Sequence, residues 1–193
     1  MSEGRGASRA LLLLGREMDG TVIRPATTAD LPAITEIYAE AVATGTASFE
    51  VVAPDQGEME HRFARVSSGG FPYLVAERAG TVLGYGYVSA YRERPAYRHT
   101  VENSVYLAVD ARGQGIGGAL LRRLIDDATI LGFRQMIAVI GDSANEASIR
   151  LHKAAGFELI GTLKDVGYKH DRWLDTVIMQ RALGPGATTQ PTR

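Results

Sequence analysis

The pattern of hydrophobic and polar positions divides most of the chain into short apolar strands and longer amphipathic helices. Leucine, isoleucine and alanine recur at helical spacing after Thr28 or Asp30 and again between Gly117 and Leu131. This spacing predicts four helices: about a dozen residues after Thr28 or Asp30, then about 55–67, 117–131 and 145–155. Strands are predicted at 21–24, 73–77, 82–89, 101–109, 136–140, 157–166 and 173–180.

The order of these elements predicts an α/β (α+β) fold. Two strands joined at Ala79-Gly80 form a hairpin, and the last two strands form another. The wholly apolar segment 136–140 is expected to be central and buried. Strands that alternate with helices in the middle of the chain predict a mixed sheet of six to seven strands with helices on both faces.

Length and composition indicate one domain without disulfides. We expect a single domain over 20–183, with a disordered extension at 1–19 and a disordered tail at 184–193. The net charge of −1 comes from interspersed charges, so neither a nucleic acid nor a membrane is an expected partner. The absence of cysteine excludes thiolate metal sites and a cysteine nucleophile, and it is consistent with a cytoplasmic protein.

A glycine-dense turn connects the strand at 101–109 to the helix at 117–131. Its glycines allow a phosphate to approach the unpaired amides at a helix start. Gly113-x-Gly115-x-x-Gly118 matches the spacing of a dinucleotide-binding turn, although Asp110-Ala111-Arg112 separates it from the strand. No Gly-Lys-Ser/Thr follows, which excludes a P-loop. A pyrophosphate cradle over 112–117 and a glycine-rich connection without a ligand both remain open.

Five sequence blocks carry a family resemblance that covers about 21–182. Arg112-x-x-Gly115-x-Gly117 and Asn145-x-x-Ser148-x-x-x-His152-x-x-x-Gly156-Phe157, in this order of elements, resemble the GNAT acetyltransferase superfamily. The segment 94–106, which contains Thr100-Val101-Glu102, is similar to the phosphinothricin and methionine sulfoximine N-acetyltransferases, as are Gly167-Tyr168-Lys169 and Arg172-Trp173-Leu174-Asp175. The resemblance implies the GNAT fold, with a twisted and mostly antiparallel sheet.

The resemblance also implies acetyl-CoA as co-substrate, no metal, and a homodimer as the common assembly. Its pyrophosphate would bind the turn at 112–117, and its pantetheine arm would pair with the backbone at the end of the strand. Arg112 and Asn145 also have plain interpretations as a solvated arginine and a helix cap. The predicted cofactor-binding residues are Leu107, Ala108, Val109, Arg112, Gly113, Gln114, Gly115, Ile116, Gly117, Asn145, Ser148 and His152.

Two residues are candidates for catalysis. Glu102 is a carboxylate within a largely apolar strand, where burial would raise its pKa and suit it to accept a proton from a substrate ammonium. The alternative is a structural ion pair, for example with Arg98. His152 lies one helical turn after Ser148 and is a candidate general acid for the leaving thiolate. Its alternative is a half-buried histidine that only packs.

The substrate predicted from the resemblance is a small amino acid or analogue, such as phosphinothricin, methionine sulfoximine or methionine sulfone. Arginines between 92 and 98 suit its anionic groups, although a solvated loop is the plain alternative. Direct attack on acetyl-CoA in a ternary complex is expected. The alternatives are an acyl-CoA sensor without turnover and a protein or peptide N-terminal acetyltransferase. The predicted substrate-binding residues are Thr46, Phe49, Arg92, Arg94, Tyr97, Arg98, Thr100 and Glu102, with Tyr168, Lys169 and Trp173 at the site or at a dimer interface.

Overall fold

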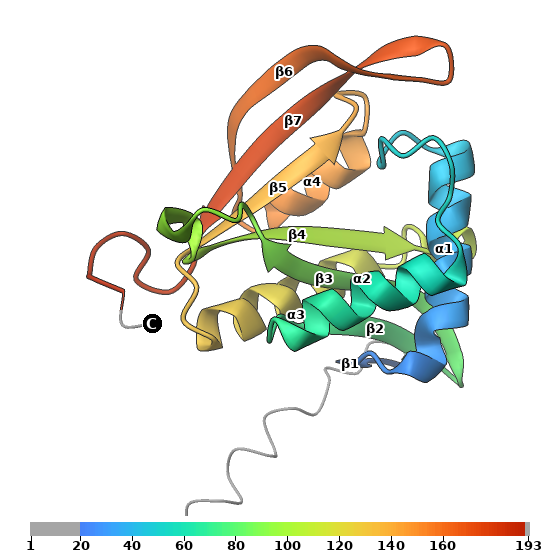
Figure 1. The fold of residues 1–193 in the computed structure, drawn as a ribbon, viewed down its shortest axis with the longest axis horizontal. Coiled ribbons are helices and arrows are strands. Elements are labelled where there is room, and N and C mark those ends of the chain that lie inside the picture. Colours follow the sequence, from blue (N-terminus) through green and yellow to red (C-terminus); the bar gives the residue numbers. More distant parts are fainter. Residues whose placement is uncertain (1–19, 192–193) are drawn as a thin grey trace, which may run out of the picture.

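A computed structural model describes residues 20–191, and the extension expected over 1–19 lies outside these described residues. These residues form seven strands and four α-helices (Figure 1). Their bounds are β1 Thr21–Pro25, α1 Leu31–Thr44, α2 Gln56–Ser68, β2 Tyr73–Arg78, β3 Thr81–Ala90, β4 Thr100–Leu107, α3 Ile116–Ile130, β5 Gln135–Gly141, α4 Glu146–Ala154, β6 Glu158–Lys169 and β7 Arg172–Ala182. Short 3₁₀ turns lie at Thr28–Asp30, Pro95–Tyr97 and Val109–Ala111.

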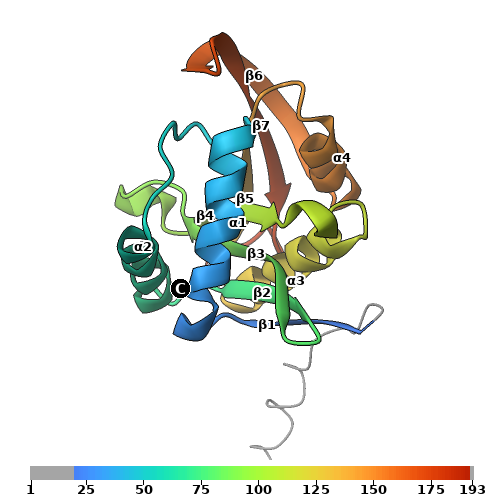
Figure 2. The same cartoon turned by 90° about the vertical axis from the view of Figure 1, so that its right-hand side faces the viewer.

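One sheet organises the described chain, with strand order β1-β2-β3-β4-β5-β7-β6. Every neighbouring pair is antiparallel except β4 and β5, which run parallel. Helices α1 and α2 cover one face, and α3 and α4 cover the other (Figure 2). This arrangement confirms the predicted mixed sheet with helices on both faces. Among the described residues, no helix has the length and apolar character that crossing a membrane requires.

Two apolar cores lie on the two faces of the sheet. On one face, Leu120, Leu121 and Leu124 of α3 are fully buried against the central strands. On the other face, helix α1 packs against a group of tyrosines from β2, β3 and β4. Tyr106 of β4 meets the ring of Tyr38 edge-on, with 5.0 Å between centroids. The helical spacing seen in the sequence therefore corresponds to real burial on each face.

Both predicted hairpins form, and their turns have left-handed backbones. Ala79 and Gly80 have φ of +50° and +82°, and His170 and Asp171 between β6 and β7 have φ of +50° and +56°. Two consecutive residues with positive φ match the right-handed twist of the flanking strands. The hairpin of β6 and β7 extends beyond the rest of the sheet (Figure 1).

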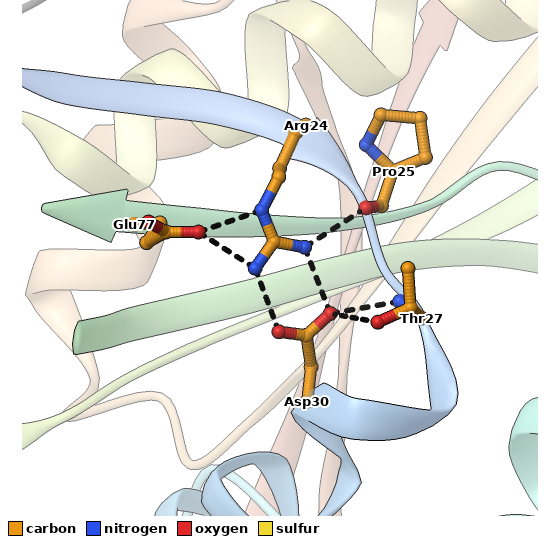
Figure 3. A network of polar contacts seen from close by, with 5 residues as sticks. All are labelled: Arg24, Pro25, Thr27, Asp30 and Glu77. Carbon is orange, nitrogen blue, oxygen red and sulfur yellow. Dashed lines mark hydrogen bonds and ion pairs between the residues drawn. The ribbon is translucent and has the colours of Figure 1, made fainter. Parts of the chain in front are cut away.

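An ion-pair network fixes the start of α1 to the edge of the sheet (Figure 3). The Arg24 guanidinium donates two hydrogen bonds to Asp30, at 2.7 and 2.8 Å, and one to Glu77 at 2.7 Å. Asp30 also accepts hydrogen bonds from the backbone N–H and hydroxyl of Thr27. The contact with Arg24 lowers the pKa of Asp30 to about 2. The folded chain therefore favours the ionised carboxylate, and the network holds the start of α1 against β1 and β2.

Two chain segments differ from the sequence prediction. Strand β4 ends at Leu107 rather than at Val109, because Ala108 makes the last backbone bond to Leu83 and the chain then turns. Val109 is half-exposed despite being apolar. The segment 184–191, where we expected disorder, contains turns that Arg134 contacts through the carbonyls of Gly186 and Gln190. Composition alone did not reveal these contacts from a distant arginine.

Candidate active site

Strands β4 and β5 pair over only four residues each and then separate. Their last paired residues are Asn103 and Ala138, although β4 continues to Leu107 and β5 to Gly141. We call the region beyond these residues the β4–β5 gap. A cavity of about 60 Å³ lies there, between both strands, Ala47 and helix α4. Within residues 20–191, the backbone of β4 beyond Asn103 thus has β3 on one side and no strand on the other.

The glycine turn lies between the end of β4 and the start of α3. Gly113 and Gly115 have φ of +76° and +79°, a conformation that glycine adopts without steric cost. In the described chain, none of the amides of residues 113–117 donates a hydrogen bond, and the first helical bond runs from Ala119 to the carbonyl of Gly115. These free amides, at the positive end of a 15-residue helix, form a site that suits an anion.

The side chains around this turn have separate tasks. Arg112 forms an ion pair with Glu40 of α1 at 2.7 Å, and Gln114 bonds to the Asp110 carbonyl and to Arg78. Ile116 is buried in the core, whereas no atom lies within 4 Å of a methyl group built on Gly113. The backbone of the turn, more than its side chains, is therefore free to meet a ligand.

Helix α4 presents three predicted residues to the cavity. Asn145 caps the helix, since its Oδ1 accepts from the N–H of Ser148 at 3.2 Å. His152 is buried, and its Nδ1 lies 2.8 Å from the Ser148 carbonyl. All three line the cavity at the β4–β5 gap. The capping interpretation of Asn145 is thus seen directly, in a position that also faces the cavity.

Glu102 has the environment expected of a proton acceptor. It is half-buried on β4, between Ser89 of β3 and Ile137 of β5. Among residues 20–191 it forms no ion pair or side-chain hydrogen bond, so the alternative pairing with Arg98 is absent. Burial raises the pKa of Glu102 above its ordinary value. The carboxylate is therefore more basic than a solvent-exposed glutamate.

Glu102 and His152 approach the sheet from opposite faces. Asn103, the neighbour of Glu102, points to His152 of α4, and successive side chains on a strand alternate between faces. Glu102 consequently lies on the face that α1 and α2 cover, while His152 lies on the face of α3 and α4. The β4–β5 gap begins between them, so a group seated there would be reached from both sides.

Three of the predicted arginines lie together beside the first residue of β4. Arg92, Arg94, Arg98 and Thr100 line a cavity of about 300 Å³, which we call the arginine cavity. None of these arginines forms an ion pair in the described chain. Arg92 lies over the rings of Tyr91 and Tyr97, at 5.2 and 5.8 Å from their centroids. The volume falls at the lower limit of small-molecule sites, and its charge suits an anion.

Thr46 and Phe49 lie elsewhere, in the loop after α1. Thr46 donates to the carboxylate of Asp142 at 2.9 Å, and Phe49 contacts Gly167 so closely that a Cβ there would lie 2.4 Å from its ring. Ala47, between them, lines the cavity at the β4–β5 gap. Of the predicted substrate residues, four therefore line the arginine cavity and Thr46 and Phe49 lie in a loop over the gap, while Tyr97 and Glu102 are not among the residues that line that cavity.

The hairpin of β6 and β7 holds this loop in place. Lys169 is buried and donates to the carbonyl of Ser48 at 2.8 Å, while Arg172 forms an ion pair with Asp142. Tyr168 and Trp173 are exposed and meet edge-to-face, with 5.3 Å between their ring centroids. Of the predicted trio, only Lys169 contacts the loop over the gap, and the two aromatic residues face outward.

Sequence reasoning did not assign a role to Asn103. Its signal was present, since it is the one polar residue on the inward face of an apolar strand, and its side chain is buried beside His152. The sequence did not indicate that Ala47 lines the cavity, because small residues are common in loops. Within the described residues, no cluster of three or more histidine, aspartate or glutamate side chains is arranged to hold a metal ion.

Comparison with known proteins gives the family. Residues 23–178 match the model of the acetyltransferase (GNAT) domain. A phosphinothricin N-acetyltransferase of Alcaligenes faecalis is 58% identical over 162 residues, which are 84% of this chain and 82% of that protein. An L-methionine sulfoximine/L-methionine sulfone acetyltransferase of Pseudomonas paraeruginosa is 43% identical over 164 residues, which are 84% of this chain and 95% of that protein.

A solved structure agrees with both sequence comparisons. The crystal structure of a GNAT superfamily phosphinothricin acetyltransferase from Sinorhizobium meliloti in complex with AcCoA has a TM-score of 0.87 and 52% sequence identity. The similarity covers 90% of this chain and 94% of that one. These findings confirm the resemblance seen in the sequence, the predicted fold class and the expectation of an acyltransferase. The chain belongs to the GNAT family of acetyltransferases.

Proposed function

We propose that this enzyme transfers the acetyl group of acetyl-CoA to the α-amine of a small amino acid or analogue. Phosphinothricin, methionine sulfoximine and methionine sulfone are the proposed substrates, since the relatives described above carry these names. The observation that carries the proposal is Glu102, a half-buried and unpaired carboxylate near the β4–β5 gap. A sensor domain has no need of a raised carboxylate pKa at that position.

Acetyl-CoA fits the free backbone groups on the α3 side of the sheet. Its diphosphate would accept hydrogen bonds from the amides of residues 113–117. Its amide-containing arm would pair with the backbone of β4 beyond Asn103, through Leu107 and Ala108 toward Val109. Asn145 and Ser148 would face the arm from α4. Arg112 holds the turn to Glu40 and would add positive charge beside the phosphates.

The amine would approach from the opposite face. The arginine cavity would bind the carboxylate and the phosphinic or sulfoximine group, with Arg92, Arg94 and Arg98 as donors. Glu102 would accept a proton from the ammonium, directly or through water, so that the free amine attacks the thioester carbonyl. Because that carboxylate lies across the sheet from His152, attack and departure of the thiolate would occur on opposite sides.

The protons balance in this scheme. An ammonium carries three protons and the product amide carries one, so two protons leave the nitrogen during transfer. One proton balances the thiol that forms on coenzyme A, and the other reaches solvent. Glu102 would accept protons from nitrogen, and His152 would supply one to the sulfur. Since no cysteine is present, direct attack in a ternary complex needs no acyl-enzyme thiol.

The exposed face of the last hairpin supports a homodimer, the assembly that the sequence resemblance implies. Six large apolar side chains exposed on one hairpin are more than scattered surface residues of a monomer usually present. Sedimentation should give the mass of two chains, and Trp173→Glu should lower it; a single-chain mass for the unaltered protein would contradict this assembly. The exposed apolar residues are Leu159, Ile160, Leu163, Val166, Tyr168 and Trp173. A cytoplasmic location stays a prediction.

The proposed activity is tested with acetyl-CoA and a panel of amines. The panel contains phosphinothricin, methionine sulfoximine, methionine sulfone, ordinary L-amino acids and a peptide with a free N-terminus. We expect amine-dependent release of the coenzyme A thiol with the three analogues. Binding of coenzyme A without release by any amine would favour the sensor, and release with the peptide alone would favour a peptide acetyltransferase.

Glu102→Gln tests the proton acceptor. In the unaltered enzyme, kcat/KM should fall as the pH drops through the raised pKa of Glu102, because the protonated carboxyl accepts nothing. The variant should lose this limb and about 10²–10⁴-fold of the rate at neutral pH. Glu93→Gln changes a carboxylate of the arginine cavity in the same way and should keep the limb. An unaltered pH–rate profile in Glu102→Gln would show that Glu102 is not the proton acceptor.

Gly115→Val tests the phosphate cradle. The side chain would crowd the amides, so the Kd of coenzyme A should rise by about tenfold or more. Because valine is strained at a φ of +79°, Gly70→Val serves as the control: Gly70 has a φ of +72° and open space in the turn before β2. Calorimetric titration of both variants separates strain from crowding. Equal Kd values in the two variants would place the cradle elsewhere.

A further inference from the structure

A polar side chain marks the point where β4 and β5 separate. Asn103 is the last residue of β4 that pairs with β5, and its side chain is buried. Its Nδ2 donates to the backbone carbonyl of Ile137 on β5 at 3.1 Å. The amide thus bridges the two strands at the start of the β4–β5 gap. A buried asparagine at this place has a defined orientation, because a carbonyl only accepts hydrogen bonds.

The other end of the same amide meets His152. Because Nδ2 faces Ile137, the Oδ1 of Asn103 faces Nε2 of His152, at 3.0 Å. The second ring nitrogen, Nδ1, lies 2.8 Å from the carbonyl of Ser148. The hydroxyl of Ser148 also lies 3.4 Å from Nδ1 and can donate to it, so the partner that can only accept is the one opposite Nε2.

This arrangement discriminates between the two positions of the ring proton. A neutral ring protonated on Nε2 donates to Asn103 and can accept from the Ser148 hydroxyl at Nδ1, and an imidazolium donates to Asn103 and to the Ser148 carbonyl. A ring protonated on Nδ1 alone would face Asn103 with a bare nitrogen, lone pairs opposed. An unsatisfied polar contact of this kind is costly in a buried place. The geometry therefore keeps a proton on Nε2 of His152.

Charged groups do not explain the state of this ring. Tyr106 is the other titratable residue of the cavity, and burial raises its pKa, so it is neutral. Glu102 of β4 points to the opposite face, and the ring of Phe157 packs edge-on at 5.0 Å. On α4 itself, three charged residues point into solvent: Glu146, Arg150 and Lys153. Burial lowers the pKa of His152 below its ordinary value, and the hydrogen bond with the Ser148 carbonyl offsets this only in part.

We propose that Asn103 is a positioning residue that keeps Nε2 of His152 protonated for the transfer reaction. This inference rests on the proposed function of His152 as proton donor. In the step, a ring that has also taken up a proton from solvent at Nδ1 loses the proton at Nε2: that N–H bond breaks, its proton joins the thiolate sulfur of coenzyme A, and the electron pair stays on nitrogen. Nδ1 keeps its proton, which faces the carbonyl of Ser148. The neutral ring then faces Asn103 with a bare nitrogen, which favours uptake of a proton from solvent and resets the donor.

Two substitutions of Asn103 should move the ring in opposite directions. Asn103→Leu has similar size and removes the acceptor, so the pKa of His152 should fall by about one pH unit. Asn103→Asp replaces the amide by a carboxylate and should raise it by a similar amount. NMR titration of the unliganded protein measures both values, with His152→Gln to assign the signal among the four histidines. A residue that merely filled space would not give shifts of opposite sign.

The kinetics supply the second readout. The alkaline limb of the kcat profile should move down in Asn103→Leu and up in Asn103→Asp, while the Kd of coenzyme A stays near that of the unaltered enzyme. Where Asn103→Leu fails to fold, Asn103→Ser, whose hydroxyl is too short to reach the ring, takes its place. Unchanged midpoints, or shifts in the same direction, would overturn the inference.

The outcomes separate this inference from the proposed function. An unaltered enzyme that acetylates no amine would overturn the proposed function and the proton transfer to sulfur. The NMR midpoints would still decide whether Asn103 sets the protonation of His152, since they need no substrate. Acetylation with unmoved midpoints would overturn the role of Asn103 alone.

Discussion

The site depends on one constraint, the early end of pairing between two parallel strands. Beyond Asn103 and Ala138 the backbone of β4 keeps β3 on one side, and no strand of the described part of the chain pairs with its other side. Buried backbone groups need partners, so this edge calls for a ligand with amide groups of its own. Because the two strands diverge, side chains on both faces of the sheet can approach a ligand in the β4–β5 gap. The glycine turn follows the end of β4 by a few residues, so a ligand that lies along the strand reaches the free amides of α3.

The two faces of the sheet divide the chemistry. The face under α1 and α2 carries a carboxylate with a raised pKa, and the other carries a buried histidine whose Nε2 faces the amide oxygen of Asn103. Burial disfavours the charged form of both groups: it raises the pKa of Glu102 and lowers that of His152, where the hydrogen bond with the Ser148 carbonyl offsets part of the effect. The last hairpin supports the loop after α1: Lys169 donates to the Ser48 carbonyl, and Arg172 pairs with Asp142, which accepts a hydrogen bond from Thr46.

Local patterns in the sequence predicted most of the fold and the elements of the site. Helical spacing predicted α3, and the wholly apolar 136–140 segment predicted a central strand, because burial on one or both faces produces a recognisable pattern of apolar residues. The end of β4 was misplaced because Val109 is apolar and yet half-exposed. Contacts between residues far apart in the sequence produce no such pattern. Thr46 and Asp142 are 96 residues apart, and Asn103 and His152 are 49 residues apart. The separation of Thr46 from the arginines needed three-dimensional information for the same reason.

The most direct test of this account is a crystal structure of the complex with acetyl-CoA. The account predicts the diphosphate on the amides of residues 113–117 and the arm along β4 beyond Asn103. It also predicts the thioester carbon within the gap, between Glu102 and His152. A diphosphate bound away from the turn, or an arm that leaves the edge of β4 unpaired, would contradict it.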